Sequence, residues 1–505
     1  MSDNVAMRAP WGLSPSPTWT NRFLELGPAF YTRWSATPLP EPAWVATSDT
    51  LAQTLGWPTD WQQHPGMLDI LAGNQPWPGS EPWASVYSGH QFGVWAGQLG
   101  DGRALCLGEI ETAVGPQEIQ LKGAGPTPYS RRADGRAVLR SSIREFLCSE
   151  AMHGLGIPTT RALALISSPA KVLRESVESA AVVTRVAPSF LRFGHFEHFA
   201  ALDRRDELER LLDHCIQHLH LGKDQLTNAA HPALALLQDV VNRTADMIAS
   251  WQAVGFCHGV MNTDNMSLLG LTLDYGPFQF MDAYDPAHIC NHTDTQGRYA
   301  FGRQPRIAHW NLHALGQALV PLVGDTDALI SVLDTYPDRF QEAWLNRMRA
   351  KLGGLAPAPD DGEFIQQLLQ WMSDERCDHT LFWRRLSLAV SHWQAGQEQE
   401  RAFEPVLDLA VDRTRLQAWL QRYQQRLQHT HLDGAGAHML RTNPKYVLRN
   451  HLAQMAIEAA QAGDPRMVRQ LLDVLQSPYD EHPEHDDWAG WPPDWAQHIE
   501  ISCSS

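Results

Sequence analysis

The sequence predicts an α+β fold, with a mainly antiparallel β-rich part followed by a helical part. Three observations lead to this prediction. Short alternating runs separated by glycine turns, typical of strands, recur within residues 81–190. Apolar residues at helical spacing recur through residues 191–475. A short polar segment, residues 256–276, interrupts the helical part and gathers the residues with the most evident chemistry.

Composition excludes several classes of protein. The chain has 505 residues, of which 43% are hydrophobic, and this is ample for a large core. The net charge of −17 argues against nucleic acid as a partner, because a nucleic-acid-binding protein needs a basic face. No apolar run approaches the roughly 18 residues that span a membrane. The N-terminus shows no secretion signal, and the seven scattered cysteines form no C-x-x-C pair, so we expect a reducing, cytoplasmic location.

The two ends of the chain differ from its middle. Residues 1–80 are rich in proline and tryptophan, and we expect them to wrap around the β-rich part as an extension. Within them, residues 49–57 predict a short helix with Ser48 as its N-cap. The last residues are acidic, and we expect a loosely ordered tail. The predicted domains are an extension (1–80), a β-rich lobe (81–190) whose motifs, described next, suggest nucleotide binding, a helical lobe (191–475) and a tail (476–505).

A glycine turn follows the first strand-like run, within Val86–Ile110. Gly100 and Gly102 have no Cβ, so backbone N–H groups there can approach a phosphate closely. Arg103 follows at once and adds a charged fork. The Asp-Gly pair in this turn is also common in ordinary hairpins. This segment alone leaves both interpretations open.

A lysine and a glutamate come next at a suggestive spacing. Glu118–Lys122 alternates like a strand and ends in Lys122, and Arg136–Leu155 predicts a helix that contains Glu145. In protein kinases a strand lysine and a helical glutamate form the ion pair that positions phosphate. Lys122 and Glu145 could equally be exposed and unrelated. The order of the motifs along the chain favours the pair.

The remaining predicted elements lead to the polar segment. Arg185 ends one of two further strands, and Arg192 follows it. Pro232 suits the first turn of a helix that leads to His258. These elements are strands at 162–167 and 180–186 and helices at 208–220, 232–254 and 310–319, with mostly helices from 325 to 475.

The polar segment carries two oxygen ligands. It predicts a loop, a small hairpin over Met266–Leu273, and an acidic residue at the hairpin exit. Asn265 and Asp274 would then face one another across the mouth of the hairpin. Amide and carboxylate oxygens are ligands that Mg²⁺ takes beside nucleotide phosphates. Protein kinases place a catalytic-loop Asn and a D-F-G motif in this order, and the chain has D-Y-G.

One position departs from the kinase pattern. The slot of the kinase base, two residues after His258, holds Val260, which cannot accept a proton. Asp264, directly before Asn265, is a different carboxylate close to this slot. An ordinary polar turn is the alternative interpretation of these residues.

Taken together, these stretches resemble the selenoprotein O family, also called the YdiU family of protein adenylyltransferases. The resemblance spans nearly the whole chain. It implies a protein-kinase-like fold, ATP bound in an inverted orientation, and transfer of AMP to protein hydroxyls. The matching text is YSGHQFGVWAGQLGDGR (87–103), QLKGAGPTPYSRRADGRAVLRSSIREF (120–146), HGVMNTDNMS (258–267), LDYGPF (273–278) and the terminal CSS.

The resemblance implies a role for each candidate residue. Asp264 would be the base, and Asn265 and Asp274 would bind Mg²⁺ or Mn²⁺. The implied partners are ATP and proteins with Ser, Thr or Tyr hydroxyls, the enzyme itself among them, with no nucleic acid and no membrane. The residues implied to contact the nucleotide are Gly100, Gly102, Arg103, Lys122, Glu145, Asp134, Gly135, Arg185, Arg192 and Asp274.

Three other functions stay open at this stage. A phosphotransferase could use Asp264 as a displaced base, and its product would carry phosphate. A catalytically inactive pseudokinase would explain Val260. A redox protein could act through Cys503, which could also form a regulatory disulfide with Cys290.

Overall fold

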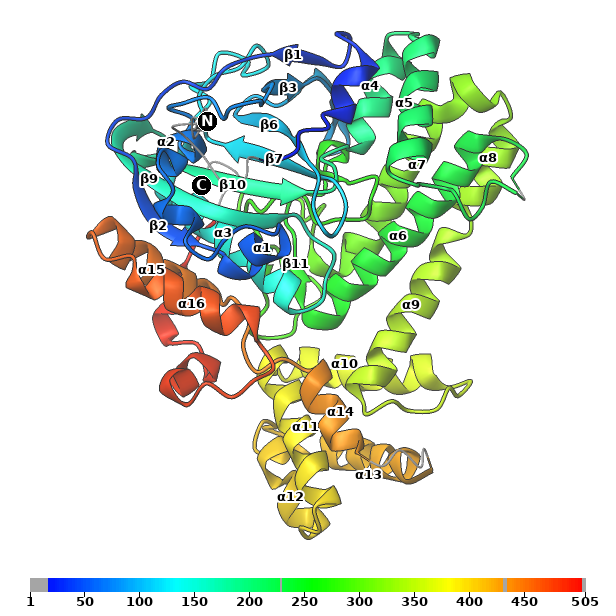
Figure 1. Ribbon diagram of the computed structural model, residues 1–505. Coiled ribbons are helices and arrows are strands. Elements are labelled where there is room, and N and C mark those ends of the chain that lie inside the picture. Colours follow the sequence, from blue (N-terminus) through cyan, green and yellow to red (C-terminus); the bar gives the residue numbers. More distant parts are fainter. Residues whose placement is uncertain (1–16, 228, 430–433, 502–505) are drawn as a thin grey trace, which may run out of the picture.

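The structure, a computed structural model, describes residues 17–227, 229–429 and 434–501 (Figure 1). Within these residues the main sheet has eight strands, and every pairing in it is antiparallel. Its order is β1-β3-β6-β7-β10-β9-β2, with β8 added on β10. Its strands are β1 (Tyr31–Arg33), β2 (Ala43–Thr47), β3 (Trp83–Ser85), β6 (Ala104–Ile110), β7 (Gln117–Lys122), β8 (Ala137–Val138), β9 (Arg161–Leu173) and β10 (Val177–Ala187).

The described residues form many helices besides the sheet, so the predicted combination of an antiparallel sheet with many helices is confirmed. The helices are α1 (Asp49–Thr54), α2 (Met67–Leu71), α3 (Leu139–Gly154), α4 (Phe193–Ala201), α5 (Arg205–His218), α6 (Pro232–Val254), α7 (Gln304–Val323), α8 (Thr326–Leu333), α9 (Tyr336–Lys351), α10 (Asp361–Asp374), α11 (His379–Gln394), α12 (Gln399–Leu407), α13 (Arg413–His429), α14 (Ala435–Thr442), α15 (Asn450–Gln461) and α16 (Arg466–Gln476). None of the described helices is long and apolar enough to cross a membrane.

The two faces of the sheet pack against different partners. Leu121 belongs to a core cluster on the face covered by α1 and α2, with a group of tryptophans. The opposite face packs against α3 and the longer helices. Successive side chains of a strand alternate between faces, so Lys122 points toward α3. Arg185 lies directly opposite Gln120 in the β7–β10 register, and it therefore shares the face of Lys122.

Residues before position 80 supply both edges of the main sheet. β1 pairs with β3 at one edge, and β2 pairs with β9 at the other. Ser48 caps α1 as predicted, because its hydroxyl accepts a hydrogen bond from Leu51 N at 3.3 Å. The boundary at residue 80 stays a prediction, and the sheet extends across it.

One local prediction is wrong and another is incomplete. The helix predicted from Arg136 begins at Leu139, because Ala137 and Val138 pair with β10 as a short strand. The run that precedes the glycine turn is itself a two-stranded hairpin, β4 (Ser88–Gln91) and β5 (Val94–Gln98), outside the main sheet. It turns at Phe92 and Gly93, whose φ angles of 52° and 79° fit a hairpin turn with two left-handed residues.

The helical predictions agree well with the structure. α6 begins and ends as predicted, with Pro232 in its first turn.

The prediction of a loosely ordered tail is wrong for the described part of the tail, which is anchored at two points. Glu481 pairs with Arg384 at 2.7 Å and with Lys445 at 2.5 Å. The Ile501 carbonyl accepts a hydrogen bond from His292 N at 3.1 Å.

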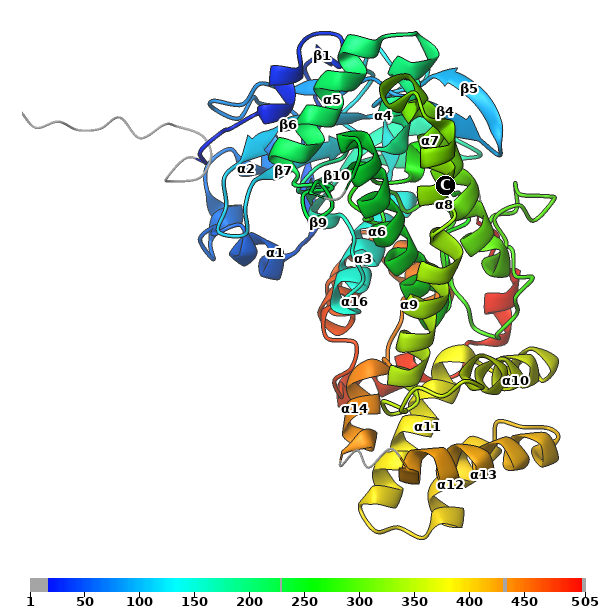
Figure 2. The same ribbon diagram turned by 90° about the vertical axis from the view of Figure 1, so that its right-hand side faces the viewer.

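The helices form two groups in space. A separate core cluster holds α10–α14 together, and Figure 2 shows this group at the end of the molecule away from the main sheet. In the same view β4 and β5 stand out from the main sheet, near α4 and α7. The hairpin therefore lies where the sheet meets the long helices.

Candidate active site

One cavity of 670 Å³ brings the predicted site residues together. It lies between the sheet face of Lys122 and the polar segment after α6. All twelve residues predicted for the site line it: Gly100, Gly102, Arg103, Lys122, Asp134, Gly135, Glu145, Arg185, Arg192, Asp264, Asn265 and Asp274.

Lys122 bridges two carboxylates from different elements. Its Nζ lies 2.7 Å from Glu145 Oε2 on α3 and 3.0 Å from Asp274 Oδ1. The lysine side chain is about one-tenth exposed. The strand lysine and the helical glutamate predicted to pair are therefore in contact, and Asp274 joins them.

Two arginines complete the charge cluster around Asp274. Arg192 Nη1 lies 2.5 Å from Asp274 Oδ2, and Arg185 Nη1 lies 3.1 Å from Asp274 Oδ1. Arg185 also reaches Glu145, with 3.3 Å between Nε and Oε1. Burial would raise the pKa of Asp274, but the charges of Arg192, Lys122 and Arg185 hold it well below its usual range. Asp274 is therefore an anion in a strongly positive surrounding.

Asp264 lies beside this cluster in a different environment. Its side chain is buried, and Oδ2 accepts a hydrogen bond from Gln91 Nε2 at 3.1 Å. Oδ1 has no hydrogen-bond partner in the described part of the chain. Burial raises the pKa of Asp264 to about 6, against the lowering effects of Gln91 and Arg192. A carboxylate with a pKa near neutrality and an unused oxygen is suited to accept a proton.

The loop before Asp264 is fixed by hydrogen bonds to its own backbone. His258 stacks on Trp251 at 5.1 Å, and its Nδ1 accepts a hydrogen bond from Val260 N at 3.3 Å. Burial lowers the pKa of His258 to about 4, so the ring is neutral at pH 7. Asn265 Nδ2 donates to the Val260 carbonyl at 2.9 Å. This bond occupies the amide nitrogen and leaves the amide oxygen as the atom that a cation would use.

The hairpin predicted over Met266–Leu273 is wrong as regular structure. Met266 and Thr272 form only an isolated bridge. Neighbouring elements hold the segment instead: Thr160 N donates to the Thr272 carbonyl at 3.1 Å, and Trp251 Nε1 donates to Thr272 Oγ1 at 3.0 Å. Asn265 and Asp274 still both reach the cavity.

Two glycine positions shape the cavity wall. A Cβ on Gly102 would lie 2.9 Å from the Tyr129 carbonyl, and one on Gly135 would lie 2.2 Å from the carbonyl carbon of Gly125. Gly135 also has a φ of +68°, which disfavours other residues. Beside it, Asp134 is ion-paired with Arg174 at 2.7 Å. The loop 123–135 folds closely on itself and presents its backbone to the cavity.

Several lining residues were not predicted. Gln91 and Phe92 come from the tip of the β4–β5 hairpin, and the Phe92 N–H donates to Asn262 Oδ1 at 3.1 Å. Asp101 is buried and accepts hydrogen bonds from the Ser85 N–H at 2.9 Å and the Ser85 hydroxyl at 2.7 Å. The sequence signal for the hairpin was the Phe-Gly pair within the run, which marks a turn there.

The donor set resembles a two-ligand metal site. The described residues contain no group of three or more His, Cys, Asp or Glu in a metal-binding arrangement. Asn265 and Asp274 supply one amide and one carboxylate, and phosphate oxygens and water commonly complete such a site for Mg²⁺. The unpartnered Asp264 Oδ1 adds a further hard oxygen nearby.

Comparison with known proteins gives a consistent result. The family model described as "Protein adenylyltransferase SelO" matches residues 16–476. A "Protein nucleotidyltransferase YdiU" of Variovorax paradoxus is 57% identical over 493 residues, which cover 96% of this chain and 97% of that protein. A protein of the same name from Dechloromonas aromatica is 53% identical over 99% of this chain and all of its own length. The resemblance noted in the sequence is confirmed, and the chain belongs to the SelO family of protein adenylyltransferases.

Proposed function

We propose that this adenylyltransferase binds ATP in the 670 Å³ cavity and transfers AMP to Ser, Thr or Tyr hydroxyls of proteins, including its own. The hydroxyl oxygen attacks the α-phosphorus, the bond from that phosphorus to the bridging oxygen of pyrophosphate breaks, and the hydroxyl proton passes to a base. Each step has a counterpart among the lining residues.

The main support for the proposal is that the residue in the slot of the kinase base cannot act as a base, whereas a different carboxylate in the same cavity can. Val260 stands in the slot of the kinase base and lines the cavity, and its side chain accepts no proton. Asp264 lines the same cavity and has an unpartnered oxygen and a pKa raised to about 6. A hydroxyl that approaches Asp264 reaches the nucleotide from another direction than in a kinase. That difference favours attack at a different phosphorus.

Three cations are suited to the leaving group. Lys122, Arg185 and Arg192 converge on one carboxylate, Asp274. Negative charge accumulates on pyrophosphate as the bond to the α-phosphorus breaks, and buried cations stabilise it strongly. We assign Arg185 and Arg192 to the terminal phosphates, with Lys122 oriented by Glu145. Gly100, Gly102, Arg103, Asp134 and Gly135 would hold the remainder of an inverted nucleotide.

The metal fits the same arrangement. Asn265 and Asp274 would hold Mg²⁺, with Mn²⁺ as the alternative, because amide and carboxylate oxygens suit hard cations. The ion would neutralise phosphate charge and polarise the phosphoryl oxygens. Asp274 is already ionised, so no proton has to leave it before a cation binds.

The proposal extends to fold, domains and location. We propose that the sheet and the long helices form the two lobes of a kinase-like fold, with the predicted domain boundaries. The antiparallel sheet, the Lys122–Glu145 contact and the Asn265–Asp274 pair support this assignment. The six described cysteines are free thiols, which agrees with a reducing compartment such as the cytoplasm.

A labelling experiment tests the reaction. The protein is incubated with α-³²P-ATP and, separately, with γ-³²P-ATP in the presence of Mg²⁺. We expect the α label, and not the γ label, to become attached to protein, with pyrophosphate as the other product. Transfer of the γ label alone would refute adenylylation and restore the phosphotransferase interpretation.

A further inference from the structure

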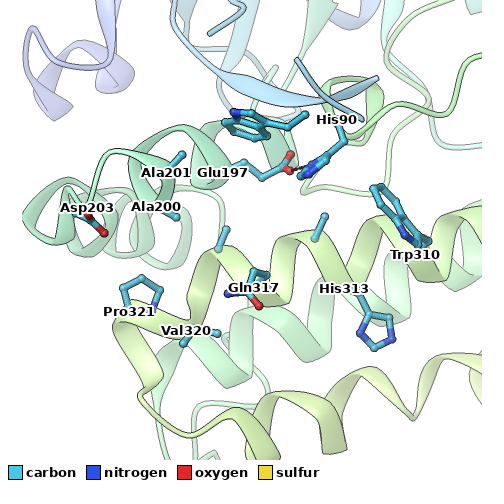
Figure 3. A pocket seen from close by; sticks show the side chains of 13 residues that line it. His90, Glu197, Ala200, Ala201, Asp203, Trp310, His313, Gln317, Val320 and Pro321 are labelled. Atoms are coloured by element: carbon cyan, nitrogen blue, oxygen red, sulfur yellow. Dashed lines mark hydrogen bonds and ion pairs between the residues drawn. The ribbon is translucent and has the colours of Figure 1, made fainter. Parts of the chain in front are cut away.

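A second hollow lies on the other side of the β4–β5 hairpin from the nucleotide cavity. It has a volume of 530 Å³ and is bounded by the hairpin, α4 and α7. Figure 3 shows His90 and Glu197 on one side of it and Trp310 and Gln317, from α7, on the other. We call it the hairpin groove.

The hairpin is a wall shared by the groove and the cavity. His90 lines the groove, whereas Gln91, the next residue, lines the cavity and donates to Asp264. Successive side chains of a strand point to opposite faces, so the two neighbours serve the two hollows. A polypeptide in the groove would therefore lie one hairpin away from the candidate base.

The groove contains a buried carboxylate with unused hydrogen-bonding capacity. Glu197 Oε1 is bonded to His90 Nδ1 at 2.6 Å, and Oε2 has no hydrogen-bond partner in the described chain. The Glu197 side chain is only 3% exposed. A buried oxygen without a partner is costly, so a donor that displaces the covering side chains and reaches Oε2 would form a favourable hydrogen bond. At the end of the groove, Asp203 is exposed and adds a second carboxylate.

Aromatic rings complete the lining. The ring centroid of His90 lies 5.1 Å from that of Trp95 and 5.4 Å from that of Trp310. Both tryptophans are over one-third exposed, which is unusual for such large rings. Arg298 stacks on Trp310 at 4.8 Å, but no described arginine or lysine lines the groove itself. Aromatic walls beside one buried and one exposed carboxylate suit an aliphatic chain that ends in a cation.

We propose that the hairpin groove binds a lysine or arginine side chain of the protein substrate, close in sequence to the hydroxyl that is modified. The stem of the side chain lies between Trp95 and Trp310, its charged group reaches Glu197, and Asp203 adds negative charge farther along the groove. This rests on the proposed function, because it defines which proteins present a hydroxyl to Asp264. Since an extended chain advances about 3.3 Å per residue, the basic residue stands only a few positions from that hydroxyl.

Binding and transfer are measured separately. The probes are fluorescein-labelled Ala/Ser decapeptides that carry one Arg at successive positions, and the same series with Glu. Fluorescence anisotropy at about 0.15 M salt, where long-range attraction is screened, reports binding. Transfer of α-³²P-AMP to the same peptides reports the reaction. The ATP-induced change in Tm verifies that each variant keeps its nucleotide site.

The variants keep shape and remove charge. The groove double variant combines Glu197→Gln with Asp203→Asn. Gln is isosteric with Glu, and Asn tolerates the left-handed φ of 52° at position 203. The control double variant combines Asp213→Asn with Asp327→Asn, and it removes the same amount of charge from exposed positions outside the groove. Trp310→Ala removes the aromatic wall, and Trp491→Ala removes an exposed tryptophan elsewhere.

We expect Arg peptides to bind in preference to Glu peptides, with one favoured position. The groove double variant should weaken this binding by about tenfold or more, as loss of a charge-assisted hydrogen bond implies, and the control double variant should not. If the Arg and Glu peptides bound equally, or if the groove variants left the preference for Arg peptides unchanged, the proposal that the groove binds a basic side chain would be refuted. Transfer of the α label without groove-dependent binding would refute the groove proposal alone, whereas groove-dependent binding with transfer of the γ label and not the α label would refute the proposed function.

Discussion

Asp264 and Asp274 show how neighbouring charges give two carboxylates different chemistry. Asp264 is buried and Asp274 is half-buried, and both line the same cavity. Asp274 contacts three cations and stays ionised, whereas Asp264 accepts a hydrogen bond from a neutral amide and has a pKa near 6. Two titratable groups whose pKa values are shifted in opposite directions are typical of acid–base sites. It supports Asp264 as base and Asp274 as metal ligand.

Replacing Asp264 tests its role as base. We expect Asp264→Asn to lower kcat for AMP transfer by roughly 10²–10⁴-fold, the usual contribution of a general base, with ATP affinity nearly unchanged. Asp213→Asn, an exposed carboxylate on α5, serves as the matched control. Steady-state kinetics and ATP titration measure the two effects. If affinity fell in proportion to the rate, Asp264 would be a ligand or a structural residue.

The pKa of Asp264 also predicts a pH dependence. A base works only when it is ionised, so kcat should rise with pH through about 6 and level off above pH 7. Below this pKa, each pH unit should cost about tenfold in rate. Transfer rates measured between pH 5 and 8 at saturating ATP test this prediction. The rise in rate with pH should be absent in Asp264→Asn. A rate that is flat across this range would contradict proton transfer to Asp264.

Asp274 is more than a metal ligand, because it neutralises buried cations. Asp274→Ala should abolish transfer, and it leaves Lys122, Arg185 and Arg192 facing one another without their shared anion. Removing one partner of a buried ion pair costs about 3–5 kcal/mol, so the free energy of unfolding should fall by this order. Pyrophosphate should restore stability more in this variant than in the unmodified protein. Urea unfolding with and without pyrophosphate measures both effects, and full activity in the folded variant would refute the assignment.

At the scale of elements, the site depends on loops and strands that constrain one another. The β7–β10 register puts Lys122 and Arg185 on one face, and α3 carries Glu145 to that face. The loop 123–135 then folds against Gly135, where a side chain has no room. The cavity is therefore shaped by backbone contacts as much as by charged side chains.

A pair of glycine variants separates crowding from backbone strain. Gly135 and Gly115 both have positive φ, but a Cβ on Gly115 would meet nothing within 4 Å. Gly115→Ala should cost about 1 kcal/mol of stability through its φ alone. Gly135→Ala should cost more and should also weaken ATP binding, because the loop must move. Urea unfolding and ATP titration measure the two effects, and equal behaviour of the two variants would show that the close approach at Gly135 is unimportant.

At the scale of the whole molecule, segments far apart in the sequence meet near the site. The tail reaches back to the segment after Asp274, where the Ile501 carbonyl pairs with His292. Cys290 lies two residues before His292 and is buried, and burial raises its pKa well above the usual range of a thiol. Cys503, predicted to pair with it, lies outside the described residues. That pairing stays a prediction.

The thiol pair predicts a regulatory effect. After mild oxidation, peptide mapping under non-reducing conditions should find a Cys290–Cys503 peptide, and activity should fall until reductant is added. Because Cys290 is buried and protonated, it should react slowly with iodoacetamide in the native state. Cys503→Ser is the control that should remove both the peptide and the response. Activity indifferent to oxidation would leave the terminal cysteine without this role.

The sequence by itself determined the family and a set of candidate residues that the fold brings to one cavity. Local patterns were sufficient for α6, the cap of α1 and the strands β6, β7, β9 and β10, because caps and alternation depend on near neighbours. They failed at Ala137–Val138, at the hairpin after Ser88 and over Met266–Leu273. At Ala137–Val138 and over Met266–Leu273 the conformation depends on partners distant in the sequence, β10 and Trp251. The hairpin pairs locally, and only its turn at Phe92 and Gly93 was missed.

Only the tertiary structure decided how the site residues act on one another. The sequence pairs Lys122 with Glu145 by spacing, but it does not show that Asp274 also contacts this lysine and two arginines. It offers Asp264 as a base but not the burial and the Gln91 contact that set its pKa. Electrostatic effects depend on distance and desolvation through space, and neither quantity is encoded in the spacing of residues along the chain.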